Sequence, residues 1–162
     1  MSLRSNVFRK DKYIFYYPTR INQWRDFLIK TKFPIKRYKI YKLGNITIKD
    51  FVTTKTRIDF CISPVKFIER IANADLVISA SFHCIAMSLI LNVPFVAILT
   101  GDQGKDERLL NLLRITGLES RILNEKISLN EINRPTNFLQ AEAKLKKYRN
   151  RSKDFLKKAI FT

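Results

Sequence analysis

The sequence has little of the material from which flexible linkers, disulfide frameworks and metal sites are built. Its 162 residues include four glycines, five prolines, two cysteines and a single histidine. So few glycines and prolines favour one folded unit over domains joined by long linkers, and we expect a single domain over 1–162. Cys61 and Cys84 lie in apolar surroundings with no second pair of ligands nearby. This pattern argues against disulfides and a zinc site, and it indicates a reducing compartment.

Acidic residues are also scarce. The chain has 14 Asp and Glu against 31 Lys and Arg, a formal net charge of +17. Such a field attracts nucleic acid, anionic lipid or phosphorylated substrates, although a lysine-rich solvated surface is an equally good explanation. No zinc-ligand set, RNA-recognition aromatic motif or glycine-rich strand-end loop accompanies the charge. Nucleic acid is therefore the least favoured of these partners.

Targeting and membrane-spanning segments are not evident either. The basic leader 1–11 is not followed by the apolar region of a signal peptide. The most apolar stretch, 84–99, is bordered or interrupted by His83, Asn92 and Pro94, which favours a soluble α/β unit over a membrane span. We expect a cytoplasmic protein, with peripheral association at the inner face of the membrane as an option.

What the sequence does contain is a strong βαβ pattern over 74–99, ADLVISASFHCIAMSLILNVPFVAIL. Leu76–Ile78 and Phe95–Leu99 are short apolar runs typical of parallel strands buried on both faces. Between them, Cys84–Leu91 is apolar on nearly every side and predicts a buried helix, which Asn92 and Pro94 end. Such crossovers join parallel strands with a right-handed turn.

The remaining segments extend this pattern to a three-layer α/β fold with a Rossmann-like parallel sheet. We expect further strands at 12–17, 37–43 and 121–123, and helices at 21–30, from Pro64 after a Ser63 cap, and from Leu109 to Gly117. The helix from Pro64 is short and amphipathic, and its apolar side carries Val65, Ile68, Ile71 and Ala72. The stretch 46–56 mixes strand-like residues with charges and gives only a weak signal.

A long helix is predicted over 137–160. One face of this helix is strongly basic. The opposite face carries an apolar stripe whose residues recur at alternating intervals of three and four: Phe138, Ala141, Leu145, Tyr148, Ser152, Phe155 and Ala159. We expect the stripe to dock on the domain. A partner helix or an anionic membrane surface remains an alternative, because basic amphipathic helices bind both.

The candidate site lies where strands end. His83 follows Ser79 and Ser81 in a strand-to-helix turn, and ligands of open parallel sheets bind at the carboxyl ends of strands. A helix N-terminus there favours an anion. The loop 100–108, with Gly101, Lys105 and Arg108, lies at the end of the next strand and is suited to a phosphate, although it is not a P-loop. The alternatives are a structural histidine and an ordinary connecting loop.

At these residues the chain resembles the polysaccharide pyruvyl transferase family. The resemblance rests on these segments, which extend it from about Lys12 to the end: Ile62–Pro64, Ala74–Ile78, Ser81–His83, Asn92–Val96, Arg108–Leu113, Gly117–Arg121 and Arg151–Leu156. It implies the C-terminal half of a protein with two Rossmann-like domains facing each other across a cleft, the GT-B arrangement. The amino-terminal half would then come from a separate domain or a homo-oligomer.

The resemblance also implies an activity in cell-surface or exopolysaccharide biosynthesis. Phosphoenolpyruvate would be the donor substrate, a sugar with two hydroxyl groups the acceptor, and the product a cyclic ketal, with no metal or other cofactor. His83 would be the acid/base or phosphate-contacting residue, and Cys84 and Ile85 would offer backbone N–H groups. Lys105 or Arg108 would supply a counter-charge. Many relatives have arginine in place of Ser81 and glycine in place of Cys84.

The length of this chain leaves open whether it catalyses the reaction without an amino-terminal half. One alternative is a non-catalytic module that binds anions or sugar phosphates. Another is a basic protein that binds membrane surfaces or nucleic acid through its charge.

Overall fold

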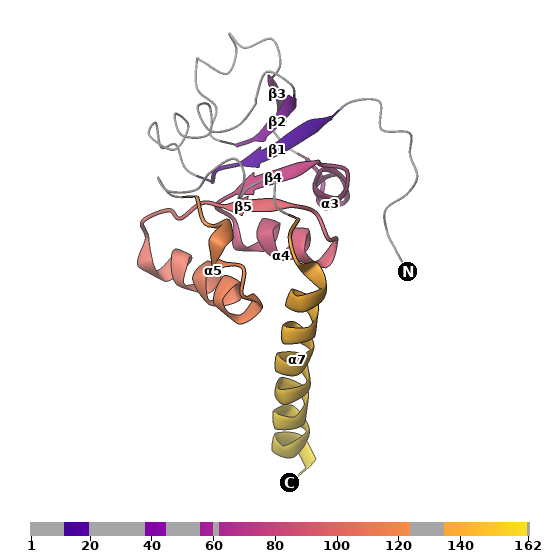
Figure 1. Cartoon of the computed structure of the whole chain (residues 1–162), viewed down its shortest axis with the longest axis vertical. Helices are drawn as coiled ribbons and strands as arrows, with labels where there is room; N and C mark the ends of the chain where they lie inside the picture. The colour runs from indigo at the N-terminus through magenta and orange to yellow at the C-terminus, as the bar shows by residue number, and fades with distance from the viewer. Residues whose placement is uncertain (1–11, 20–37, 45–55, 60–61, 124–134, 162) are drawn as a thin grey trace.

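Five parallel strands form the centre of the structure, a computed structural model that describes residues 12–19, 38–44, 56–59, 62–123 and 135–161 (Figure 1). The strands are β1 (Tyr13–Tyr17), β2 (Lys39–Leu43), β3 (Thr56–Asp59), β4 (Leu76–Ser79) and β5 (Phe95–Ala97). Their order across the sheet is β3-β2-β1-β4-β5, and every neighbouring pair is parallel. This is the strand order of a Rossmann-like sheet.

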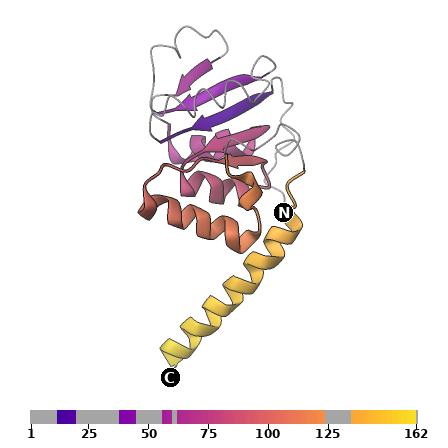
Figure 2. The same ribbon diagram turned by 60° about the vertical axis from the view of Figure 1, so that its left-hand side comes forward.

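Three helices cover one face of this sheet: α3 (Pro64–Ala72), α4 (Phe82–Ile90) and α5 (Gln103–Thr116) (Figures 1 and 2). From β3 to β4 to β5 the chain always moves in the same direction across the sheet, so crossovers of one hand place their helices on one face. The core on this side contains Phe15, Val77, Ile85, Phe95, Leu109 and Leu113, all fully buried or nearly so.

The second face of the sheet is also buried. Ile14, Tyr16, Ile78, Val96 and Ile98 form a separate apolar cluster there. The α/β class, the parallel Rossmann-like sheet and the long C-terminal helix are thus confirmed. The third layer of the predicted three-layer fold, the leader 1–11, the helix predicted at 21–30 and most of 46–56 fall outside the described residues.

Two of the local start and stop signals act as predicted, and a third acts earlier in the chain than predicted. Ser63 caps α3 by accepting from the Lys66 N–H at 3.3 Å, and Pro64 occupies the first helical position. Gly117 ends α5 with a left-handed φ of 71°, a conformation that glycine adopts without strain. Helix α4 begins at Phe82, two residues earlier than predicted, because Ser81 is its N-cap and accepts from the Cys84 N–H at 3.4 Å.

Strand β3 is the element that the sequence did not reveal. Thr56–Asp59 is polar and lies at the edge of the sheet, where it pairs only with β2. It is also held from the side, because Arg70 of α3 forms an ion pair with Asp59 at 2.9 Å. The strand predicted at 121–123 is reduced to a one-residue bridge between Ile122 and Ala97, preceded by the 3-10 helix η2 (Glu119–Arg121).

The buried face of α3 differs from the prediction. Val65 and Ile68 were expected to face the core, yet 67% and 40% of their surfaces are exposed. Ile71 is buried as predicted, and Phe67, four residues earlier and therefore on the same side of the helix, packs against the core with it.

Among the described residues, the last helix, α7 (Phe138–Phe161), contacts the rest of the domain through its first turns, where it packs on α5. Ala141 is buried and Phe138 packs against the core, whereas every residue from Lys146 to Ile160 is exposed. Figures 1 and 2 show this part projecting away from the sheet and its helices. The predicted docking of the whole stripe is therefore wrong beyond Leu145. The physical reason is that α5, on which α7 packs, ends at Gly117 beside Lys144. None of the described helices has the length and apolarity needed to cross a membrane.

Candidate anion-binding site

The candidate site lies between the carboxyl ends of β1 and β4. From these neighbouring strands the chain continues to β2 on one side and to β5 on the other, and such a point is where parallel sheets bind ligands. A pocket of about 200 Å³ occupies this place. It is lined by residues that follow β1, β4 and β5 and by the first turns of α4 and α5: Thr19, Ala80, Ser81, Phe82, His83, Thr100, Lys105 and Arg108.

The N-terminus of α4 forms one wall of the pocket. Phe82 and His83 occupy the first two helical positions, where backbone N–H groups have no acceptor within the helix. Cys84 and Ile85 were expected to present their N–H groups here. The structure instead pairs the Cys84 N–H with the Ser81 hydroxyl and the Ile85 N–H with the Ser81 carbonyl at 3.1 Å. The N–H groups that give the positive end of the helix dipole at the pocket are therefore those of Phe82 and His83.

Three side chains around Phe82 supply positive or titratable groups. The His83 ring lies edge-on to the Phe82 ring at 5.5 Å, and the Arg108 guanidinium lies 5.9 Å from the centre of the same ring. Lys105 forms an ion pair with Asp102 at 3.2 Å. Lys105 and Arg108 were predicted on a loop, but both belong to α5, which begins at Gln103.

The predicted site residues divide into two groups. Ser81, His83, Lys105 and Arg108 line the pocket, whereas Ser79, Cys84, Ile85 and Gly101 do not. Ser79 lies fully buried at the end of β4 and ties two strands and the turn together. Its hydroxyl donates to the Tyr17 carbonyl at 2.8 Å and accepts from the Ser81 N–H at 3.0 Å.

Four residues that line the pocket were not in the predicted set: Thr19, Ala80, Phe82 and Thr100. The available signal was their position directly after a predicted strand or turn, since Thr19 follows β1 and Thr100 follows β5. Thr19 has a φ of 59°, which is strained for a β-branched residue. Strained backbone of this kind is enriched at functional sites.

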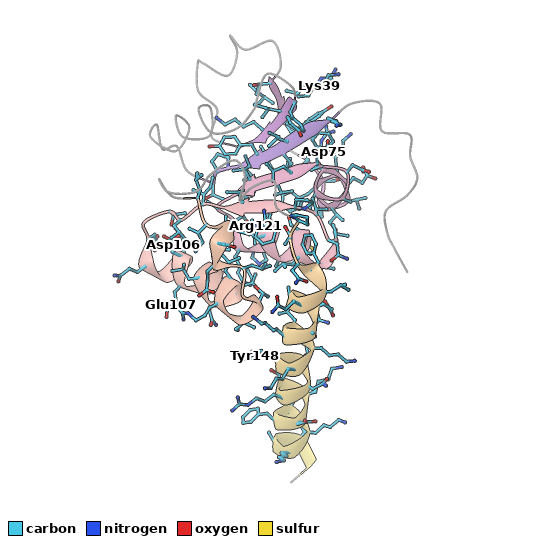
Figure 3. All side chains as sticks on the ribbon, in the orientation of Figure 1. Lys39, Asp75, Asp106, Glu107, Arg121 and Tyr148 are labelled. Carbon is cyan, nitrogen blue, oxygen red and sulfur yellow. The ribbon has the colours of Figure 1, made fainter. Side chains whose placement is uncertain are left out.

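Asp106 organises the turn between β5 and α5. Its carboxylate accepts hydrogen bonds from the Thr100 N–H at 2.7 Å, the Thr100 hydroxyl at 2.8 Å and the Gly101 N–H at 2.7 Å. The side chain is almost fully buried, and the same turn carries Lys105 into the pocket wall. Figure 3 shows Asp106 on α5. The sequence does not indicate this role, because the hydrogen-bond partners of Asp106 come together only in the folded turn.

A sequence profile of a known family, described as polysaccharide pyruvyl transferase, matches residues 2–102, which is more than half of the chain. The chain belongs to the polysaccharide pyruvyl transferase family. The match includes β1 to β5, α4 and His83, whereas α5 and α7 lie beyond it. The resemblance over Arg108–Leu113, Gly117–Arg121 and Arg151–Leu156 therefore stays a prediction.

Comparisons with individual proteins add less. No curated protein sequence matches this family member. Among solved structures, it is similar to the glycosyltransferase SnogD from Streptomyces nogalater, with 12% identity and a TM-score of 0.44. The similar region covers 86% of this chain and 42% of the SnogD chain.

Among the described residues of this family member, no group of three or more His, Cys, Asp or Glu lies together as metal ligands would. Cys84, at the inner side of α4, is a buried free thiol. Burial raises the pKa of the Cys84 thiol to about 12, and a hydrogen bond with Ser79 opposes this rise. The thiol therefore stays protonated in the folded chain at neutral pH.

This thiol makes stability depend on pH in the alkaline range. The folded state holds the Cys84 proton up to a pKa of about 12, whereas the unfolded thiol loses it near 9.0. Since the unfolded state then binds fewer protons, the free energy of unfolding falls as pH rises from 9 to 12, by about 1.4 kcal/mol per pH unit from this group. Urea unfolding at several alkaline pH values should show a shallower fall for Cys84→Ala than for the wild type. Equal slopes would contradict the prediction.

Proposed function

We propose that this chain is the donor-side half of a polysaccharide pyruvyl transferase and binds phosphoenolpyruvate in the pocket at the ends of β1 and β4. The observation that carries the proposal is the convergence there of His83, Lys105 and Arg108 with the N-terminus of α4. The product would be a pyruvylated sugar of a cell-surface polysaccharide or exopolysaccharide.

The pocket suits the chemistry of this donor. Phosphoenolpyruvate has a carboxylate and a phosphate, both of which need positive charge and N–H donors. Arg108 provides a guanidinium, which forms two parallel hydrogen bonds to such groups, and Lys105 provides an ammonium. The first N–H groups of α4 provide further donors. Asp102, which pairs with Lys105, would give up that ion pair when an anion binds.

His83 is the residue to which the proposal assigns proton transfer. The methylene carbon of the donor gains a proton, its neighbouring carbon bonds to two sugar oxygens, and phosphate leaves. Of the two protons released by the sugar hydroxyl groups, one balances the new methyl group and the other balances the phosphate. Histidine can accept and donate protons near neutral pH. The exposed ring of His83 lies at the rim, where an acceptor sugar would approach.

One observation favours a second candidate, a module that binds the anion without turnover. Within the part of the chain that the structure describes, no hydrogen bond to the His83 imidazole is formed. General bases are usually oriented by such a partner. In a transferase this partner would come from the substrate or from a second domain.

Calorimetric titration tests the donor site. Phosphoenolpyruvate should bind the wild type saturably, and Arg108→Ala should weaken binding by about tenfold or more, because it removes charge-assisted hydrogen bonds. Arg114→Ala is the matched control: it removes an exposed arginine from the same helix, outside the pocket. Its affinity should stay within about twofold of the wild type.

Two further outcomes separate the alternatives. Equal weak binding of phosphate and phosphoenolpyruvate by all three proteins would mean that net charge alone explains the signal, and the donor site would be rejected. Phosphate release with an acceptor polysaccharide, lost in His83→Ala, would establish the transferase. Saturable binding of phosphoenolpyruvate, with no phosphate release whichever acceptor is supplied, would favour the binding module.

A further inference from the structure

We propose that the projecting part of α7, residues 146–160, binds an anionic lipid surface. We call this segment the α7 arm. The proposal concerns a surface remote from the pocket and does not rest on the proposed function.

The arm has an apolar side that nothing in the described structure covers. Tyr148, Phe155, Leu156 and Ile160 have 48%, 71%, 55% and 69% of their surfaces exposed. At 100° per residue these positions lie within about 140° of the helix circumference, with the small residues Ser152 and Ala159 between them. Arg149 is the one charged residue of the arm in this sector. Side chains of this size are normally buried, so an exposed row of them marks an interaction surface.

The rest of the arm is strongly positive. Seven lysines and arginines and one acidic residue occur within 146–160, all on exposed positions: Lys146, Lys147, Arg149, Arg151, Lys153, Asp154, Lys157 and Lys158. Arg149 forms an ion pair with Glu142 at 3.1 Å, and this carboxylate offsets one of the positive charges. Figure 3 shows long side chains extending outward along this helix on both sides.

This combination selects an anionic lipid surface over a second copy of the chain. Two arms packed along their apolar sides would bring like charges together along their whole length, which opposes pairing. A lipid surface satisfies both features at once, because the apolar side enters the boundary of the acyl chains while lysines and arginines reach the negative headgroups. The arm is already helical and already separated from the domain, so binding needs little ordering.

Vesicle co-sedimentation tests the proposal with the full chain. Vesicles of phosphatidylcholine with phosphatidylserine should bind the wild type, and vesicles of phosphatidylcholine alone should bind it far less. The charge variant Lys153→Gln, Lys157→Gln and Lys158→Gln should bind about 100-fold more weakly, because each basic residue near an anionic surface contributes about fivefold. The apolar variant Phe155→Ser and Leu156→Ser should lose about tenfold or more.

Matched controls remove the same groups elsewhere. Lys12→Gln, Arg57→Gln and Lys66→Gln remove three exposed charges from outside α7. Val65→Ser and Ile90→Ser remove two apolar side chains with 67% and 62% of their surfaces exposed, on α3 and α4. Both controls should keep most of the vesicle binding, and phosphoenolpyruvate binding should be the same in all of these variants.

Three results would overturn the proposal. Absence of binding to the phosphatidylserine vesicles is the simplest. Equal loss in the charge variant and its control, with no loss in the apolar variant, would show a diffuse effect of the +17 net charge. The third result is a dimer, seen by sedimentation equilibrium, whose population rises with protein concentration. If this dimer is lost in the apolar variant and vesicles do not change its population, a second copy of the chain covers the arm.

Discussion

Asp106→Asn is expected to lower the free energy of unfolding by about 3 kcal/mol and to weaken anion binding in the pocket. The wild-type carboxylate accepts three hydrogen bonds of 2.7 to 2.8 Å from Thr100 and Gly101. An asparagine of the same shape has only one oxygen, so its amide group would face a backbone N–H that also donates. The nearly buried site gives neither donor access to water.

Urea unfolding of Asp106→Asn, with Asp154→Asn as its control, measures this effect. Asp154 lies exposed on α7, and its substitution should change stability by less than about 0.5 kcal/mol. The substitution at Asp106 should also reduce the affinity for phosphoenolpyruvate, because Thr100 and Lys105 lose the turn that holds them at the pocket. Unchanged stability would show that the turn does not depend on this carboxylate.

Phe15→Ala is expected to lower the free energy of unfolding by about 3 to 5 kcal/mol, a large fraction of the stability of an ordinary domain. Phe15 lies fully buried in the middle of β1, between β2 and β4, and its ring packs edge-on against Phe67 of α3 at 5.8 Å. Removing it leaves a cavity where the sheet meets its helical layer, and strands cannot shift to fill it without breaking pairing on two sides.

The control is the same substitution on the α7 arm. Phe155→Ala removes an identical ring from a side chain with 71% of its surface exposed, and it should change the free energy of unfolding by less than about 0.5 kcal/mol. If Phe15→Ala cost no more than Phe155→Ala, the assignment of β1 as the central buried strand would be wrong.

The parts of the fold that depend on local signals could be predicted from sequence. The strands around 76–78 and 95–99 are continuous apolar runs, and Ser63, Asn92 and Gly117 mark helix ends through chemistry that acts within a few residues. The residues of 37–43 alternate as those of a strand do, and Tyr38 and Ile40 pack on one face of the sheet while Tyr41 and Leu43 pack on the other.

The parts that depend on distant partners could not be predicted in this way. Thr56–Asp59 becomes a strand through pairing with β2 and through the ion pair of Asp59 with Arg70, and its own composition is polar. The stripe of α7 showed which side of the helix is apolar. It did not show that α5, the helix on which α7 packs, ends at Gly117 beside Lys144. A sequence pattern therefore identifies the apolar face of a helix but not the element that covers this face.

The candidate site shows the same division. His83 and Ser81 were found because they follow a strand and open a helix. Lys105 and Arg108 were found by charge but placed on a loop, because the helix start at Gln103 depends on the turn that Asp106 stabilises. The N–H donors were assigned two residues too late along α4, since the capping bond from Cys84 to Ser81 could not be located without the start of the helix.

The central position of β1 also affects the folding of the chain during its synthesis. Its strand partner β4 follows it by 62 residues, the separation of the bonds from Tyr13 to Asp75 and from Ser79 to Tyr17. A ribosome adding about 5 to 20 residues per second therefore exposes one side of an aromatic strand, YIFYY, for several seconds before β4 emerges. During that interval the strand is a template for pairing with other chains, so a nascent chain that stalls before Leu76 should be prone to aggregation.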